Sequence, residues 1–350
     1  MSLYDRLADL SLVVTDWGLD LREAETSSGF TRATTVVSLD GPDARGHGED
    51  VTYEAEAHRA LVDREPAFDL AGEYTLREFG TLLDGIDLFP DHPPEQAMGR
   101  HYRRWGFESA ALDLALRQAD TDLASALGRK YDPVRFVAST RLGEPPTAGR
   151  VHALLDAVPD LEFKLDPTGD WTASLVEDLA DTGAVRILDL KGQYEDTVVD
   201  QPADPELYEL VLDAFPDAIV EDPELTGETH PLVTDEVSRL SWDYPVTDPE
   251  SVGAQGLQPA WINVKPSRFG GLEALLDTVE HCEREGIGMY GGGQFELGVG
   301  RQHLHAFASV LYPDGPNDVA PRVYNRPEPP VDPPTSPLDP PERPHGLGWR

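Results

Sequence analysis

From Val134 onward, the chain is a series of short apolar runs separated by stretches of helical periodicity. The runs read VRFVAST, LEFKLD, VRILDLK, AIVED, LSWD, WINVKPS and IGMYGGG. Strands that alternate with helices are typical of parallel βαβ units, and eight such units close a barrel in ~250 residues. We therefore predict an α/β fold with a modified TIM (β/α) barrel over residues 131–321. A doubly wound sheet is the alternative, although no GxGxxG follows the first strands.

Charged side chains end five of these runs. They are Lys164, Asp189, Glu221, Asp243 and Lys265, spaced 22 to 32 residues apart. The carboxyl ends of barrel strands form one face, so we expect these groups to converge on one mouth. Three converging carboxylates repel one another unless a hard cation such as Mg²⁺ lies between them. The spacing therefore predicts Asp189, Glu221 and Asp243 as metal ligands. The competing interpretation of each acid, in a chain with 65 of them, is a solvated surface position.

Lysine is rare in this chain, and arginine supplies most of its 28 basic residues. The four lysines are Lys130, Lys164, Lys191 and Lys265. Three of them lie at strand ends, where a lysine offers a tunable pKa that arginine lacks. Alternation along a strand places Asn263 on the same face as Lys265. A metal beside lysines is the combination that removes a proton next to a carboxylate. The metal neutralises the enediolate, and a lysine whose pKa is lowered by neighbouring cations moves the proton.

Two motifs resemble the enolase superfamily, in the branch of muconate cycloisomerases and o-succinylbenzoate synthases. NVKPSRFGGL (263–272) is similar to the lysine strand of that branch, and GGGQFELGVGR (291–301) to its glycine-rich loop. VEDP (220–223), FESAALDLA (107–115) and PNDVAP (316–321) are also similar, and the resemblance covers roughly residues 100–350. It implies the same three Mg²⁺ ligands, with Lys265 as acid/base or cationic stabiliser. It also implies that Glu296 and the backbone around Gly293 line the pocket.

Two positions depart from the pattern of that branch. Its second strand ends in Lys-x-Lys, but this chain has Lys164-Leu165-Asp166, and Lys191 stands where Asn is common. Either Lys191 replaces the lost base and is held by Asp166, or the two residues form a structural ion pair. The candidate catalytic residues are Lys265, Lys191 and Lys164. The candidate substrate-binding residues are Asp166, Asn263, Gly293 and Glu296.

These features predict a Mg²⁺-dependent lyase or isomerase, of the cycloisomerase or dehydratase type, that abstracts the proton alpha to a carboxylate. One alternative is o-succinylbenzoate synthase of menaquinone synthesis, favoured by the loops and disfavoured by Asp166. Another is a barrel that binds a metal or a carboxylate but has lost catalysis. The expected partner is a small-molecule carboxylate, and a homo-oligomer is left open.

The formal net charge is −37, which argues against a nucleic-acid or anionic-membrane binder. The acid is dispersed rather than gathered in a tail, so we predict a surface adapted to high salt, as in halophiles. No apolar run approaches the length of a membrane span, and the opening MSLYDRLADL is unlike a signal peptide. These features predict a cytoplasmic protein.

Residues 1–130 are expected to form an α+β capping domain, completed by residues 322–350. Within it we predict strands at 10–14 and 34–39, a helix at 54–62 and a long helix from His101. Gly46, Gly48 and Glu49 are expected to form a turn. The terminal HGLGWR resembles the segment with which the superfamily returns to its cap, which implies an ordered end.

Overall fold

The computed structural model describes residues 1–27, 29–64, 67–90, 92–194, 200–328 and 330–349. Its central sheet is parallel and has the order β12-β11-β10-β9-β8-β7-β6, so neighbours in the sheet are neighbours in the chain. The strands are β6 (Val137–Thr140), β7 (Glu162–Leu165), β8 (Val185–Asp189), β9 (Ile219–Glu221), β10 (Leu240–Trp242), β11 (Trp261–Val264) and β12 (Gly288–Gly291). Each strand lies within one of the apolar runs, which confirms the predicted α/β class.

A two-residue segment stands where an eighth strand was expected. Asn317 forms a parallel bridge with Phe136, and Asp318 forms one with Gly292. The amide of Val137 donates to the Asn317 carbonyl over 2.8 Å. The Asn317 side chain in turn accepts from the amide of Gly291 over 2.6 Å. The segment thereby joins the two outer strands β6 and β12, and the sheet closes as a modified barrel.

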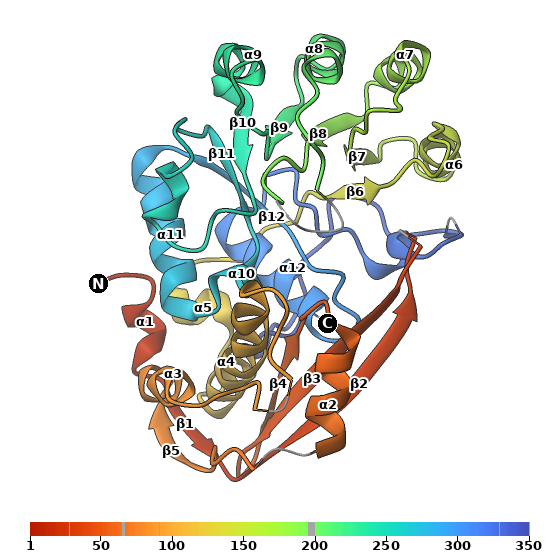
Figure 1. Ribbon diagram of the computed structural model, residues 1–350. Helices are drawn as coiled ribbons and strands as arrows, with labels where there is room; N and C mark the ends of the chain where they lie inside the picture. The colour runs from red at the N-terminus through yellow and green to blue at the C-terminus, as the bar shows by residue number, and fades with distance from the viewer. Residues whose placement is uncertain (28, 65–66, 91, 195–199, 329, 350) are drawn as a thin grey trace.

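Amphipathic helices surround the sheet, and Figure 1 shows α6 to α9 fanned around its outside. They are α6 (Gly149–Ala157), α7 (Ala173–Asp181), α8 (Pro205–Ala214), α9 (Thr229–Asp235), α10 (Pro266–Phe269), α11 (Leu272–Glu285) and α12 (Gly300–Leu311). Short 3₁₀ helices span Val237–Arg239, Ser251–Gly253 and Arg322–Asn325. Helix α8 begins at the N-cap Asp204, which accepts from two backbone amides, with Pro205 in its first turn. In α11 the fully buried side chains recur at helical spacing, as in Leu275, Val279 and Cys282.

The N-terminal cap is an α+β layer beneath the barrel mouth in Figure 1. Strands β2 (Asp16–Glu25), β3 (Thr31–Asp40) and β4 (Arg45–Asp50) form an antiparallel sheet, and β1 (Ser11–Val14) pairs with β5 (Gly72–Thr75). The helices are α1 (Asp5–Ala8), α2 (Ala55–Arg64), α3 (Leu76–Asp84), α4 (Met98–Gln118) and α5 (Leu123–Leu127). The two expected strands correspond to β1 and β3, the first expected helix to α2 and the long one to α4.

The predicted turn at Gly46, Gly48 and Glu49 is wrong, because these residues lie inside strand β4. Helix α4 crosses this strand at very short range. A Cβ on Gly48 would lie 2.0 Å from the carbonyl oxygen of Gly106, and one on Gly46 would lie 2.3 Å from that of Ala110. Glycine is therefore present for close packing of a helix on the strand and not for a turn.

The C-terminal segment packs against α4 and α5. The amide of Gly346 donates to the Thr121 carbonyl over 2.9 Å, and the amide of Leu347 donates to Asp113 Oδ1 over 2.8 Å. The last residue of the expected cap segment, Arg350, lies outside the described residues. Within the described part of the chain, no helix combines the length and apolarity that crossing a bilayer requires.

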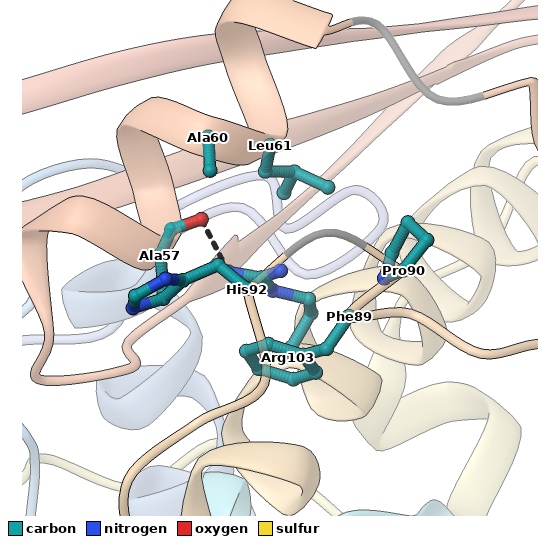
Figure 2. Close-up of a pocket in the computed structure, with 7 residues that line it drawn as sticks. All are labelled: Ala57, Ala60, Leu61, Phe89, Pro90, His92 and Arg103. Carbon is teal, nitrogen blue, oxygen red and sulfur yellow. Dashed lines mark hydrogen bonds between the residues drawn. The ribbon is translucent and has the colours of Figure 1, made fainter.

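A small cavity lies in the cap between α2 and the segment around Phe89, and Figure 2 shows its lining. Arg103 fills one side of it. Its Nη2 donates to the Ala57 carbonyl over 2.9 Å and its Nε donates to Asp50 Oδ2 over 2.7 Å. The remaining volume of about 10 Å³ has room for one water at most. The cavity is therefore part of the packing of the cap and is too small to hold a substrate.

Candidate active site

Three carboxylates meet at the carboxyl ends of the central strands. Asp189 ends β8 and lies beside Glu221, which ends β9. Ser241 of β10 also pairs with Glu221, so Asp243 lies two residues further along, on the same face. One oxygen from each carboxylate lies within 4.8 Å of the others, and all three side chains are fully buried. This separation is close to what two ligands at ~2.1 Å from one Mg²⁺ can have, so the expected convergence is present and the donor set fits a hard cation.

The three lysines proposed from the sequence all reach these carboxylates. Lys164 Nζ lies 2.5 Å from Glu221 Oε1 and 2.9 Å from Asp189 Oδ2. Lys191 contacts Asp189 Oδ2, and Lys265 Nζ lies 2.7 Å from Asp243 Oδ2. The fourth lysine is different: Lys130 has an 82% exposed side chain and pairs with Asp132, two residues along the chain. Lysine has thus been kept where carboxylates converge.

The protein's own groups raise the pKa values of Lys164 and Lys191, whereas the sequence led us to expect neighbouring cations to lower a lysine pKa. Burial favours the neutral amine of Lys164, but the Asp189 and Glu221 carboxylates outweigh burial and raise its pKa well above the usual value. Burial also opposes the charge of Lys191, and there Asp166 and Asp189 raise the pKa. The sequence suggested that cations would be the nearest neighbours, whereas carboxylates are. The protein's own groups therefore hold Lys164 and Lys191 as ammonium ions.

The acids of the site divide into two kinds. Burial would raise the pKa of Asp243, but the adjacent Arg268 and Lys265 charges lower it below its usual range. For Glu221, burial and the neighbouring Asp189 carboxylate both raise the pKa. The cluster therefore carries anionic charge beside its lysines, while Glu221 is the member most readily protonated.

Three further side chains, which we did not expect from the sequence, contact these carboxylates. Arg268 Nη1 lies 2.5 Å from Asp243 Oδ1, and the Tyr194 hydroxyl donates to Asp243 Oδ2 over 2.9 Å. The Tyr290 hydroxyl donates to Glu221 Oε2 over 2.5 Å. Arg268 stands three residues after Lys265 in the quoted motif, so its spacing was a usable signal. Tyr290 lies in an apolar run, where an aromatic residue cannot be distinguished from a core residue, and Tyr194 lies in a polar stretch with no motif around it.

Asp166 was expected to pair with Lys191, either to hold it as a base or to form a structural ion pair. Its Oδ1 lies 3.9 Å from Lys191 Nζ, too far for a hydrogen bond, and this buried oxygen has no hydrogen-bond partner among the described residues. The close partner of Lys191 is Asp189 instead. Asn263, as alternation required, turns toward the triad, and its Nδ2 lies 3.4 Å from each oxygen of Glu221. Its Oδ1 also lacks a partner within the part of the chain that the structure describes. Asp166 and Asn263 therefore both carry an unused acceptor near the carboxylates.

The glycine-rich loop after β12 brings Glu296 and the backbone toward the site in different ways. Glu296 accepts from the amide of Gln294 over 2.5 Å and lies 3.0 Å from Arg301. A Cβ on Gly293 would lie 2.6 Å from a Glu296 oxygen, so this glycine lies against the glutamate. It is Gly292 that approaches the lysine strand, since its Cβ would lie 2.7 Å from Lys265 Cε.

A carboxylate of the cap holds the far end of this loop. Glu49 of β4 is fully buried in effect, with 1% exposure, and accepts from the amides of Leu297, Gly298 and Gly300 over 2.7, 2.8 and 2.7 Å. These amides lie at the N-terminus of α12, where a negative charge is favourable. Burial raises the pKa of Glu49, although the Thr34 hydroxyl and the amides favour its charged form. The cap thus contacts the barrel through a loop that borders the site.

Two family models match the chain. The "Domain of unknown function (DUF8230) N-terminal domain" matches residues 5–126, and the corresponding C-terminal domain matches residues 130–326. No curated protein matches the sequence.

The fold is also similar to that of several solved structures. Muconate lactonizing enzyme from Pseudomonas putida has a TM-score of 0.70 and 20% identity over 96% of each chain. Muconate cycloisomerase from Pseudomonas fluorescens has a TM-score of 0.68 and 18% identity over 97% of this chain and 96% of the other. An enolase superfamily member from Listeria innocua has a TM-score of 0.67 and 19% identity over 89% and 86%. The architecture, cap and barrel together, is therefore that of the enolase superfamily.

Proposed function

The chain belongs to the DUF8230 family, and we propose that it is a Mg²⁺-dependent lyase or isomerase that removes the proton alpha to a carboxylate. The observation that carries the proposal is the triad of buried carboxylates, Asp189, Glu221 and Asp243, with oxygens within 4.8 Å of one another. Gathering buried acids is costly unless a cation is held among them. Carboxylate oxygens are the ligands that Mg²⁺ prefers.

The metal would be held by the three carboxylates and would offset the negative charge that develops on the substrate carboxylate. We assign the three lysines different roles, substrate attraction or proton transfer, from the carboxylates that each contacts. Lys164 contacts two triad carboxylates, and its raised pKa keeps it an ammonium that attracts an anionic substrate. Lys191 carries the same kind of charge beside Asp189. Lys265 contacts the single carboxylate of Asp243 and is the residue to which we assign proton transfer at its Nζ.

Two groups are suited to orient the rest of the substrate. Asp166 Oδ1 and Asn263 Oδ1, which have no partner in the described ranges, are acceptors, and they match a hydroxyl or other donor on the bound molecule. These assignments leave the substrate as a small carboxylate that also carries a hydrogen-bond donor.

The test is exchange of the alpha proton with solvent deuterium. Small carboxylic acids with an activated alpha position are incubated with the protein in D₂O at high salt, with and without Mg²⁺, and followed by proton NMR. We expect exchange that requires Mg²⁺ and that is lost in Asp243→Asn. A wild-type protein that binds no Mg²⁺ or Mn²⁺ by calorimetry at high salt would overturn the proposal.

Two other functions remain distinguishable by the same preparation. An o-succinylbenzoate synthase is supported by the similarity of the loops and would eliminate water from the substrate of that enzyme. A barrel that binds a metal or carboxylate without catalysis is supported by the dense pairing of the triad with Lys164, Lys265 and Arg268. Metal binding without exchange on any acid would favour the second of these functions.

A further inference from the structure

Three side chains on one face of α4 contact the main chain immediately after Lys265. They are His101, Arg104 and Glu108. Their partners follow in chain order: the carbonyls of Arg268 and Gly270, each at 2.7 Å, and the amide of Leu272 at 3.2 Å. A carbonyl only accepts, so His101 must carry its proton on Nδ1. Spacings of three and four residues place all three side chains along one stripe of the helix.

The segment that they hold has little structure of its own. Helix α10 (Pro266–Phe269) is a single turn, which is unstable in isolation. It ends at Gly270, whose φ of +71° is left-handed, and a Cβ there would lie 3.0 Å from His101 Cγ. The turn is therefore fixed from outside, by β11 before it and by α4 alongside it.

Both cations on Asp243 depend on this turn. Lys265 immediately precedes α10 and Arg268 lies within it, and their side chains reach Asp243 at 2.7 and 2.5 Å. We propose that His101, Arg104 and Glu108 are positioning residues of the cap, which lock the 265–272 segment so that Lys265 and Arg268 meet the Asp243 carboxylate. The positioning of Lys265 and Arg268 by α4 does not depend on the proposed function. Only the role of Lys265 in proton transfer rests on it.

His101, Arg104 and Glu108 can position the 265–272 segment because two of them, Arg104 and Glu108, are held by further contacts. Arg104 also contacts Glu108 on the same helix and donates to the Gly80 carbonyl of α3 over 3.2 Å. Glu108 is 5% exposed, so its contact with Leu272 is shielded from water. A hydrogen bond in such surroundings transmits the position of α4 to the turn.

The scarcity of lysine makes a direct test practical. Acetylation by a water-soluble active ester, followed by mass spectrometry, reports the four lysines separately. In the wild type we expect fast labelling of Lys130 and strong protection of Lys265, whose exposure is 6%. His101→Phe removes the hydrogen bond to Arg268 but keeps a ring, and should accelerate labelling of Lys265 about fivefold, the ratio that corresponds to one hydrogen bond. Lys164 and Lys191 should keep their wild-type rates.

Two further variants complete the design. His101→Asn retains an N–H donor near the Nδ1 position and should restore protection of Lys265. Arg100→Ala, which removes an exposed partner of Asp87 from the same helix, should leave every rate unchanged. The free energy of unfolding of each variant, from denaturant titration, identifies general loosening.

The proposal is overturned if His101→Phe leaves Lys265 protected, if all three site lysines accelerate together, or if His101→Asn fails to restore protection. Labelling needs no turnover, so a failure of the proposed enzymatic function would leave this result standing. Where exchange activity is found, His101→Phe should lower kcat with little change in KM.

Discussion

Lys191 lies in the left-handed backbone region, with φ of +56°, which is uncommon for a side chain of this size. Its amide approaches Asp189 Oδ1 at 3.3 Å while its ammonium contacts the other oxygen of the same carboxylate. Strand alternation does not apply to a left-handed residue. The sequence shows that a lysine stands at position 191 in place of the common Asn. It does not show that this lysine contacts Asp189 more closely than Asp166, because that depends on the left-handed backbone.

This partner choice separates the roles of two lysines. Arginine keeps a positive charge but cannot accept a proton near neutrality, so Lys265→Arg should reduce alpha-proton exchange by about 10²-fold. Lys191→Arg should keep activity within about tenfold, because we assign Lys191 only a charge. Lys130→Arg is the matched surface control. Equal loss in Lys191→Arg and Lys265→Arg would instead identify Lys191 as a second base.

His303 of α12 gives a residue-scale prediction about stability. Burial lowers its pKa to about 4, and no described residue forms a hydrogen bond with its Nδ1. The folded protein holds the neutral ring, so the unfolded chain binds the extra proton more readily. Stability should therefore be complete above pH ~6.5 and fall as the pH drops toward 4, by ~3 kcal/mol at most.

Denaturant titrations between pH 7 and pH 4.5 measure this slope. Acids elsewhere also titrate in the lower part of this window, so the comparison is with His303→Leu, which should show a shallower decline than the wild type. Parallel slopes in the two proteins would mean that His303 does not contribute to the pH dependence.

At the scale of elements, the sequence predicted the strands that are buried along most of their length. The barrel strands are buried apolar runs, and two of them, β8 and β9, end in the carboxylates Asp189 and Glu221. Strand β2 was missed because none of its residues is buried, and its apolar alternation spans only Trp17, Leu19 and Leu21 before charged residues follow. The closing segment at Asn317 and Asp318 is too short to carry a periodic signal, and its role depends on strands distant in sequence.

The Glu49 contact predicts a measurable link between strand β4 and the loop before α12. Glu49→Gln replaces one acceptor oxygen with an NH₂ group, which cannot accept from the amides that this oxygen now serves: Leu297 and Gly298 donate to Oε1, and Gly300 donates to Oε2. We expect a loss of ~2 kcal/mol in the free energy of unfolding, the cost of leaving a buried donor unsatisfied. Glu23→Gln, on the exposed strand β2, should cost at most ~0.5 kcal/mol. Equal costs would show that the carboxylate does not hold the loop.

At the scale of the whole molecule, the cap and the barrel are joined by polar contacts that converge near the site. Glu49 reaches the loop after β12, while His101 and Glu108 reach the segment after β11. Long-range pairs of this kind cannot be read from one sequence, since each partner alone resembles an ordinary polar residue. Composition, by contrast, is a whole-molecule property, and it supports a prediction about solvent conditions.

With 65 acidic and 28 basic residues, the folded chain concentrates negative charge that the unfolded chain spreads out. The Debye length falls from ~30 Å at 0.01 M salt to ~3 Å at 1 M, so salt should relieve this repulsion over nearly the whole surface. We therefore expect the melting temperature to rise steeply with KCl between these concentrations. Scanning calorimetry in EDTA isolates this screening effect, and adding millimolar Mg²⁺ at constant ionic strength then reports the carboxylate triad separately. Glycine betaine, which carries no net charge, should not reproduce the effect of KCl, and a flat KCl profile would remove the case for adaptation to high salt.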